Sequence, residues 1–420
     1  MSSLPSLPAT PPVKQDHEGR QRKQEHKDFL DVTNHPNLSS ASARPAKAAA
    51  AAFPEAVAFA DEVGVLLGNL NRTNLETSLK TYSDFETRYY RSETGVEAAR
   101  WLLDQVRATV KASGVEGASA EPFEHADFDQ ISVIARIPGK STSAVVVGAH
   151  LDSINGANNF GRSPGADDNG SGTVTLLEAL RVVLSDPKVA AGEHENTIEF
   201  HWYAGEEAGL LGSADIFDQY AAAGADVKAY LNQDMTGWAP PGEAGEFGII
   251  LDYVDEGLTE FTRLVLDAYT TIPAVDTRCG YACSDHASAR AAGYPAAFIF
   301  EAAADNTSPY IHTANDAYDT VSFDHVMEHA RLVVGFVPVK SVAALQDVGG
   351  GIQYKDVGAH YVDLGSDSRR LCDDLDNVTA KVAIFPGTIC DDIRDPVQAV
   401  EPRLRSETSV SIGATRCLPN

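Results

Sequence analysis

The chain has 420 residues, of which 43% are hydrophobic, and a formal net charge of −27. Nucleic acids and anionic membranes bind basic surfaces, so this charge excludes them as expected partners. The hydrophobic content is ample for a core, and no apolar run approaches the length of a membrane span.

The two ends of the chain differ in composition from its middle. Residues 1–52 begin with a stretch rich in Pro, Ser, Gln, Lys and His, and we expect this extension to be disordered because it has little apolar surface to bury. It also lacks the apolar core of a secretory signal peptide. Residues 346–420 carry three of the five cysteines and are expected to be an appendage of unknown role. Residues 53–345 are therefore the expected functional domain.

Strand-like and helical stretches alternate along this middle region. Val145–Ser153 opens with a nearly continuous apolar run, which is typical of a buried strand in a parallel sheet. Val174–Leu184 is a predicted helix, and Thr197–Tyr203 and Ala229–Met235 are predicted strands. The alternation predicts an α/β fold with a doubly wound, mostly parallel central sheet flanked by helices on both faces.

Five side chains that can bind metals lie at or just past these strand ends, or in loops: His150, Asp167, Glu207, Asp234 and His312. In an open α/β sheet, ligands gather at the carboxyl ends of the strands. The three carboxylates carry about three negative charges at neutral pH, and without a counter-charge they would repel one another or take up protons. Two divalent cations would give the site a slightly positive net charge, whereas one divalent cation would leave its net charge negative. Imidazole and carboxylate without thiolate fit zinc, cobalt or manganese, so the pattern predicts a two-metal hydrolytic site.

Each of these residues also has a structural explanation when it is taken alone. A histidine after an apolar strand is usually structural, and an Asp-Asp pair before a helix can be a helix cap. Glu206 and Glu207 could be a first-turn pair favoured by the helix dipole. For His201, which alternates within a predicted strand, and His286, at a predicted helix start, the structural explanation is preferred.

Seven stretches of the middle region resemble, in order, the secreted co-catalytic di-zinc aminopeptidases of bacteria and fungi, the leucine aminopeptidase type of peptidase clan MH. The stretches are GAHLDS, PGADDNGSG, AGEEAGLLGS, LNQDMTG, CGYACSDH, AGYPAAFIFE and YIHTANDAYDT. The similarity covers roughly Leu79 to Val334. A single motif of this kind is common on protein surfaces. Seven motifs in the order found in the family make coincidence implausible. For the ligand residues, the metal-site interpretation is therefore preferred to the structural explanations.

The resemblance implies a role for each residue of the metal site. Asp167 would bridge two zinc ions. Glu207 and His312 would complete one coordination sphere, and His150 and Asp234 would complete the other.

The same resemblance implies the residues that support catalysis. Glu206 would be the general base, which takes a proton from water and passes it to the leaving amine. Asp152 would orient His150, and Asp168 would be the second member of the Asp-Asp pair of the family. Tyr281 would help to hold the tetrahedral intermediate.

The substrate end of the site is also implied by the resemblance. A disulfide between Cys279 and Cys283 would stiffen the short loop that carries the catalytic tyrosine. Four apolar residues stand where the family lines its specificity pocket: Met235, Phe298, Phe300 and Ile311. They imply an apolar or aromatic N-terminal residue in the substrate.

The expected function is therefore that of a monomeric, secreted aminopeptidase with two Zn²⁺ per chain that acts on peptides with a free N-terminus. The cysteine pair and the Asn-x-Ser/Thr sites at Asn37, Asn71, Asn306 and Asn377 fit an oxidising compartment and a glycoprotein. Three alternatives remain open: a glutaminyl-cyclase-type acyltransferase with one zinc, a carboxypeptidase of the same clan, and a non-catalytic receptor-like ectodomain. The presence of all five ligand residues and of Glu206 speaks against the last of these.

Overall fold

The structure, a computed structural model, describes residue 32 and residues 34–39, 53–54, 56–57, 60–242 and 245–337. The appendage expected at residues 346–420 lies outside the described residues, and so does most of the extension expected at residues 1–52. Within that extension, a short helix, α2 (Pro36–Ser39), packs against α8 (Leu211–Ala223). The His35 Nε2 atom lies 2.8 Å from Asp215 Oδ1 of α8, so this part of the N-terminal segment is held by the folded domain.

One eight-stranded sheet forms the centre of the domain, with the strand order β1-β2-β4-β3-β5-β8-β6-β7. Its strands are β1 (Ser119–Phe123), β2 (Ser132–Ile137), β3 (Ser141–His150), β4 (Asn196–Tyr203), β5 (Val227–Gln233), β6 (Phe247–Ile250), β7 (Ala274–Thr277) and β8 (Ala296–Phe300). The central strands β4, β3, β5 and β8 run parallel, whereas β2 runs antiparallel to β4, and β6 antiparallel to β8. The α/β fold class and the mostly parallel sheet are confirmed.

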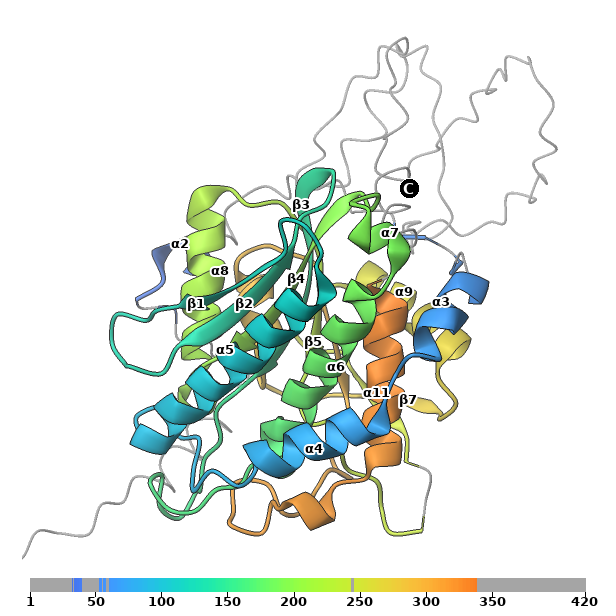
Figure 1. Ribbon diagram of the computed structural model, residues 1–420. Coiled ribbons are helices and arrows are strands. Elements are labelled where there is room, and N and C mark those ends of the chain that lie inside the picture. Colours follow the sequence, from blue (N-terminus) through green and yellow to red (C-terminus); the bar gives the residue numbers. More distant parts are fainter. Residues whose placement is uncertain are drawn as a thin grey trace, which may run out of the picture. The chain divides into compact units, whose positions relative to one another are not determined.

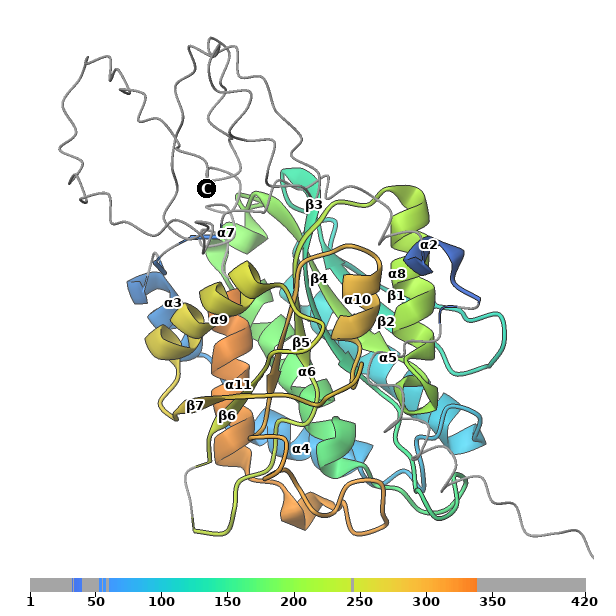
Figure 2. The ribbon, with the colours of Figure 1, turned by 180° about the vertical axis from the view of Figure 1, so that it is seen from behind.

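Helices cover both faces of this sheet. In addition to α2 and α8, the helical elements are α3 (Ala60–Leu67), α4 (Arg72–Tyr82), α5 (Glu93–Ser113), η2 (Ala166–Ser171), α6 (Gly172–Leu184), α7 (Pro187–Ala190), η3 (Glu206–Ala208), α9 (Glu256–Tyr269), α10 (His286–Ala291), η4 (Tyr318–Thr320) and α11 (Phe323–Phe336). The helices α5, α6 and α11 lie on the face seen in Figure 1, and α8 and α10 lie on the opposite face seen in Figure 2.

The core follows from the sequence pattern of the central strands. The last eight residues of β3, from Ser143 to His150, are buried, and so is all of β4, because both strands are covered on both faces. Side chains of β3 alternate between a large cluster shared with α5, α6 and α11 and a smaller one shared with α8 and α10. Burial on both sides explains the nearly continuous apolar run of β3. In β4 the polar side chains of Glu199 and His201 alternate with apolar ones and contact each other at 3.1 Å.

The parallel strands place their carboxyl ends at one edge of the sheet. His150 is the last residue of β3, Glu206 follows β4 by three residues, and Asp234 directly follows β5. The apolar run that opens Val145–Ser153 lies in β3, which ends at His150, so Asp152 lies in the loop that follows. This edge of the sheet brings the predicted site residues into one place.

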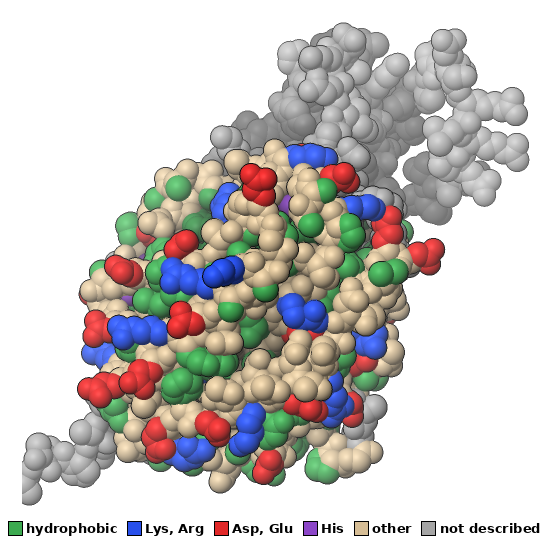
Figure 3. Space-filling model, viewed as in Figure 1, with side chains coloured by type: hydrophobic (Ala, Val, Ile, Leu, Met, Phe, Trp, Pro, Cys, Tyr) green, Lys and Arg blue, Asp and Glu red, His purple; other side chains and the backbone are tan. Residues whose placement is uncertain are grey.

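The surface of the domain carries charges of both signs. On the face seen in Figure 3, Lys and Arg side chains lie among Asp and Glu side chains, with hydrophobic side chains between them. Within the described part of the chain, no helix combines the length and the apolar character that crossing a membrane requires.

Candidate metal centre

Two groups of metal-binding side chains meet at the carboxyl ends of the parallel strands. In the first group, the buried His150 Nε2 atom lies 3.1 Å from Asp168 Oδ1 and 3.1 Å from Asp234 Oδ1. In the second group, His312 Nε2 lies 3.0 Å from Asp168 Oδ2 and 2.9 Å from Glu207 Oε2. Asp168 belongs to both groups, so one carboxylate lies between two imidazoles.

The structure differs here from the expectation that Asp167 bridges the site. The Asp167 carboxylate turns away from the two histidines, and its Oδ1 atom accepts hydrogen bonds from the Gly237 backbone N–H at 2.9 Å and from Ser171 Oγ at 3.1 Å. It also shares a hydrogen bond with the buried Glu301. Asp168 was expected only to follow the bridging aspartate in the sequence. Its carboxylate instead lies in the position shared by the two metal-binding groups.

The local backbone explains this exchange of positions. Asp168 and Asn169 have non-helical backbone angles inside η2, with φ −100° and ψ 99° at Asp168. Neighbouring side chains in such an irregular turn point in different directions. Sequence spacing alone therefore does not tell which of two adjacent aspartates faces the site.

Burial and mutual repulsion shape the electrostatics of the two groups. Burial, with the nearby charge of Asp168, raises the pKa of the Glu207 carboxyl to about 7. Burial also opposes ionisation of Asp168, but hydrogen bonds from His150 and His312 outweigh it and lower the pKa of that carboxyl. The pKa of His150 is raised because the charges of Asp234 and Glu206 outweigh the effect of its burial. In the absence of a cation, protons held by the imidazoles would therefore balance part of the negative charge.

The Asp152 carboxylate contacts His150 and also the turn after β4. Its Oδ1 atom lies 3.4 Å from His150 Nδ1, which is the ring nitrogen that faces away from the metal-binding group. The two carboxylate oxygens also accept the backbone N–H groups of Glu206 at 3.0 Å and of Glu207 at 3.3 Å. One fully buried carboxylate thus orients the histidine of β3 and the turn that follows β4.

Asp316 is a site residue that the sequence reasoning missed. Its carboxylate oxygens accept the backbone N–H groups of Asp167 at 2.9 Å and of Asp168 at 3.0 Å. These bonds hold the irregular turn of η2 from a position about 150 residues further along the chain. The residue stands in the stretch YIHTANDAYDT, but its spacing from His312 gave no reason to single it out.

Arg88 is a second missed residue. It is fully buried, and its guanidinium donates to the backbone carbonyl oxygens of Leu151, Pro164 and Gly165. The same guanidinium lies over the ring of Tyr82, 4.4 Å from its centroid. Arg88 therefore connects the loop after β3 to the turn that leads into η2.

Glu206 begins η3 directly after Gly205, which has a positive φ of 65°. Burial raises the pKa of its carboxyl, as do the charges of Asp234, Asp285 and Glu207, although the charge of His150 opposes them. Glu206 thus lies within electrostatic reach of both metal-binding groups, while Glu207 is the one of the pair whose carboxylate contacts His312. The two adjacent carboxylates therefore differ in their contacts with the metal-binding groups.

The loop of Tyr281 lies at the rim of the same site. A disulfide joins Cys279 and Cys283, with an S–S distance of 2.11 Å. Burial, with the charges of Glu206 and Asp234, raises the pKa of the Tyr281 hydroxyl to about 12, so it stays protonated and can donate a hydrogen bond.

The four expected pocket residues lie on β8 or in the turns next to the ligands. Phe298 and Phe300 share one face of β8, with ring centroids 5.7 Å apart, and Phe298 and Met235 are buried. Met235 directly follows Asp234, and Ile311 directly precedes His312. The Phe298 ring also lies 4.8 Å from His286, whose Nε2 atom is 3.0 Å from the Asp252 carbonyl oxygen, as befits a structural histidine.

Comparison with known proteins places this arrangement among peptidases. The model of Peptidase family M28 matches residues 132–337. Leucine aminopeptidase 1 of Arthroderma otae is 52% identical over 295 residues, which are 69% of this chain and 79% of the relative. Leucine aminopeptidase 1 of Grosmannia clavigera is also 52% identical over 295 residues, which are 69% of this chain and 72% of the relative.

Solved structures show the same fold. LapB from Legionella pneumophila is 30% identical, with a TM-score of 0.63, over 74% of this chain and 80% of that one. The LapA aminopeptidase of the same organism is 32% identical, with a TM-score of 0.61, over 66% of this chain and 73% of that one. A glutaminyl cyclase from Porphyromonas gingivalis, at 19% identity and a TM-score of 0.52 over 63% of this chain and 97% of that one, shares the fold alone.

Proposed function

The chain belongs to peptidase family M28, and we propose that it is a di-zinc aminopeptidase that removes apolar residues such as leucine from the N-terminus of peptides. The observation that carries this proposal is the Asp168 carboxylate, which lies between His150 with Asp234 on one side and His312 with Glu207 on the other. The names of the fungal relatives favour an aminopeptidase over a cyclase.

The residues present fit two zinc ions. Each group offers one imidazole nitrogen and two carboxylate oxygens within 4.8 Å of one another, which is a donor set that zinc accepts. The second oxygen of Glu207, Oε1, is buried and has no hydrogen-bond partner among the described residues. The set contains three carboxylates and two neutral histidines, so two divalent ions would leave a slight positive excess near the scissile carbonyl, whereas one ion would leave the site negative. We therefore assign Asp168 as the bridging ligand, in place of Asp167.

The side chains around the metal groups supply the remaining chemistry. Zinc, when bound, polarises the scissile carbonyl and lowers the pKa of a coordinated water. The Glu206 carboxylate accepts the proton from the attacking water and returns it to the nitrogen of the leaving amine. The Tyr281 hydroxyl donates a hydrogen bond to the carbonyl oxygen as negative charge develops there. Asp152 and Asp316 hold the ligands in position through their hydrogen bonds.

The first residue of the substrate would lie against Met235, Phe298, Phe300 and Ile311. A buried carboxylate at that place would lose its hydration without gaining a partner, so leucine or phenylalanine should be preferred to glutamate. The disulfide of the Tyr281 loop fits an oxidising compartment, which supports secretion. We also propose that the enzyme acts as a monomer.

A substrate pair with one chemical difference tests the proposal. Leucine p-nitroanilide should be cleaved by the zinc-loaded protein, and N-acetyl-leucine p-nitroanilide should not, because acetylation removes the basic α-amine and adds bulk next to it. Elemental analysis should find two zinc ions per chain. Equal cleavage of the two substrates would exclude an aminopeptidase, and a single zinc would favour the cyclase-type alternative.

A further inference from the structure

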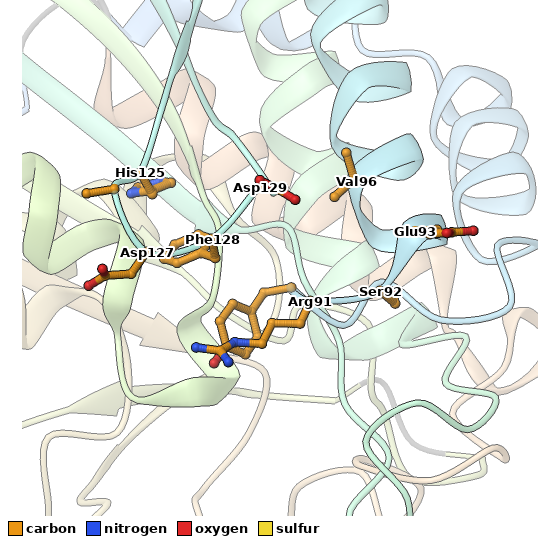
Figure 4. Close-up of a pocket in the computed structure, with 10 residues that line it drawn as sticks. Arg91, Ser92, Glu93, Val96, His125, Asp127, Phe128 and Asp129 are labelled. Carbon is orange, nitrogen blue, oxygen red and sulfur yellow. The ribbon is translucent and has the colours of Figure 1, made fainter.

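A pocket of about 430 Å³ lies beside the metal centre, and none of the predicted site residues line it. Two segments form it: Tyr90 to Val96 at the start of α5, and His125 to Asp129 between β1 and β2 (Figure 4). Phe128 lies near the centre of the view, with Asp127 and Asp129 on either side of it along the chain.

The fold places this pocket next to the turn that carries Glu206. Because β2 runs antiparallel to β4, its first residue, Ser132, lies at the carboxyl end of β4, where Ser132 Oγ accepts the Ala204 N–H at 2.9 Å. A Cβ atom added to Gly205 would lie only 3.5 Å from the Tyr90 ring. The Tyr90 ring therefore lies near the residue directly before Glu206.

A row of aromatic rings runs from the loop after β3 to the pocket. The loop after β3 is held at the second metal group, since the Gly156 N–H donates to the His312 carbonyl oxygen at 2.9 Å. The same loop carries Phe160, whose ring lies 5.1 Å from that of Tyr89. The Tyr89 and Tyr90 centroids are 4.9 Å apart, and the Tyr90 and Phe128 centroids are 5.2 Å apart.

Phe160 is the unusual member of this row. It is 61% exposed, although Tyr89 and Tyr90 beneath it are buried. Burying a phenylalanine ring is favourable by roughly 1.5–3 kcal/mol, so an exposed ring that lies over other rings at the rim of a site offers a contact to a ligand.

The sheet order indicates which part of a peptide would reach this row. The proposed pocket for the first residue lies at β5 and β8, on one side of the metal-bearing strands β3 and β4. The aromatic row and the 430 Å³ pocket lie at β2, on the other side. A peptide whose first residue points toward β8 and whose scissile bond lies at the metals must extend toward β2.

We propose that Phe160 and this pocket bind the part of the peptide that follows the scissile bond, an inference that rests on the proposed aminopeptidase function. Phe160 contacts an apolar or aromatic second residue. The pocket carries the carboxylates of Glu93, Asp127 and Asp129 against one cation, Arg91, whose guanidinium lies over the Tyr90 ring at 5.2 Å. This excess of negative charge favours a basic side chain further along the peptide.

The experiment compares substrates with and without residues beyond the scissile bond in the full-length, zinc-loaded protein. The substrates are leucine amide, which has nothing beyond the scissile bond, the peptide Leu-Phe-Ala-Lys and the peptide Leu-Phe-Ala-Glu. Phe160→Ala should lower kcat/KM for Leu-Phe-Ala-Lys about fivefold and change kcat/KM for leucine amide less than about twofold. The matched control is Val65→Ala on α3, a side chain that is 70% exposed and outside the site, and it should change neither value.

The charge of the pocket is tested by the double variant Asp127→Asn with Asp129→Asn. The preference for the lysine peptide over the glutamate peptide should fall about two- to threefold, as expected for exposed charges, with leucine amide cleavage unchanged. Equal effects of Phe160→Ala on all three substrates, or no effect on any, would overturn this inference alone. No cleavage of leucine p-nitroanilide by the unmodified protein would overturn the proposed function, and the inference with it.

Discussion

Two groups of charged side chains, one within the sheet and one at the carboxyl ends of its strands, are stabilised in different ways. Glu199 of β4 is fully buried, and protein donors contact both of its oxygens: Arg136 binds Oε1, and Tyr220 and His201 bind Oε2 at 2.8 and 3.1 Å. These hydrogen bonds outweigh the effect of burial and lower the pKa of the Glu199 carboxyl. At the carboxyl ends of the strands, by contrast, burial raises the pKa of the Glu207 carboxyl to about 7.

This difference distinguishes a structural carboxylate from a metal ligand. When both oxygens of a buried carboxylate accept hydrogen bonds from protein donors, the carboxylate needs no further partner. A charged donor such as Arg136 keeps it ionised. Three carboxylates that share two imidazoles need a cation from outside the chain. This distinction can be tested by removing the metal or substituting residues in one group, and by measuring whether zinc binding or stability changes as expected for that group alone.

Removing the metal should have the largest effect. Chelation of the purified protein should abolish peptide hydrolysis, and added zinc should restore it, because the carbonyl and the attacking water lose their activation. The free energy of unfolding should fall by about 3–4 kcal/mol for each zinc ion that is normally present at 100 to 1,000 times its dissociation constant. Activity assays and urea unfolding with and without a chelator give both values. Full activity in a metal-free preparation would contradict the proposed mechanism.

The next largest effect is expected from Glu206→Gln. The amide cannot accept the proton of water, so kcat should fall about 10²- to 10⁴-fold while two zinc ions remain bound. The matched variant Glu207→Gln should weaken metal binding instead. Elemental analysis alongside kcat separates the two outcomes. Near-normal kcat in Glu206→Gln with full metal occupancy would exclude this residue as the general base.

Asp152→Asn should have an intermediate effect. It perturbs the contact with His150 Nδ1 and weakens the acceptor for the Glu206 and Glu207 backbone N–H groups, so zinc affinity should fall about 10- to 100-fold. Competition with a chromogenic chelator measures the affinity. Glu199→Gln serves as the control, because it alters the structural group and should leave zinc affinity unchanged. A loss of affinity in the control would show that the two groups are coupled.

The smallest effect is expected in the pH dependence of stability. Glu199 has a lowered pKa in the folded state, so it stabilises the fold above its unfolded pKa and loses this contribution as the pH falls through the folded value. Burial raises the pKa of Asp285 to about 7, so its contribution is complete below its unfolded pKa, about 4, and is lost as the pH rises toward 7.

The two carboxyls should therefore give slopes of opposite sign. In metal-free protein, Glu199→Gln should reduce the loss of stability in acid, and Asp285→Asn should reduce the loss between about pH 4 and pH 7. Urea unfolding at a series of pH values measures both slopes. Slopes of the same sign in the two variants would refute the distinction between the two carboxyls.

Much of the fold was predictable from local patterns. The strands predicted at Thr197–Tyr203 and Ala229–Met235 correspond to β4 and β5, within two residues at each end. A nearly continuous apolar run likewise marked β3, because a strand covered on both faces buries every side chain. The helix predicted at Val174–Leu184 corresponds to α6, which begins two residues earlier. The order of motifs also predicted which histidines and acids gather at the strand ends.

The sequence by itself determined the α/β architecture and the candidate set of metal-binding residues, since both follow from residue type and short-range spacing. Only the tertiary structure decided that Asp168 rather than Asp167 faces both histidines, that Asp316 and Arg88 hold the loops of the site, and that an aromatic row extends from the loop after β3 to β2. These features depend on the direction of single side chains and on contacts between residues far apart in the chain. Residue spacing specifies neither the direction of a side chain nor a contact between distant residues, because both arise when the chain packs around the sheet.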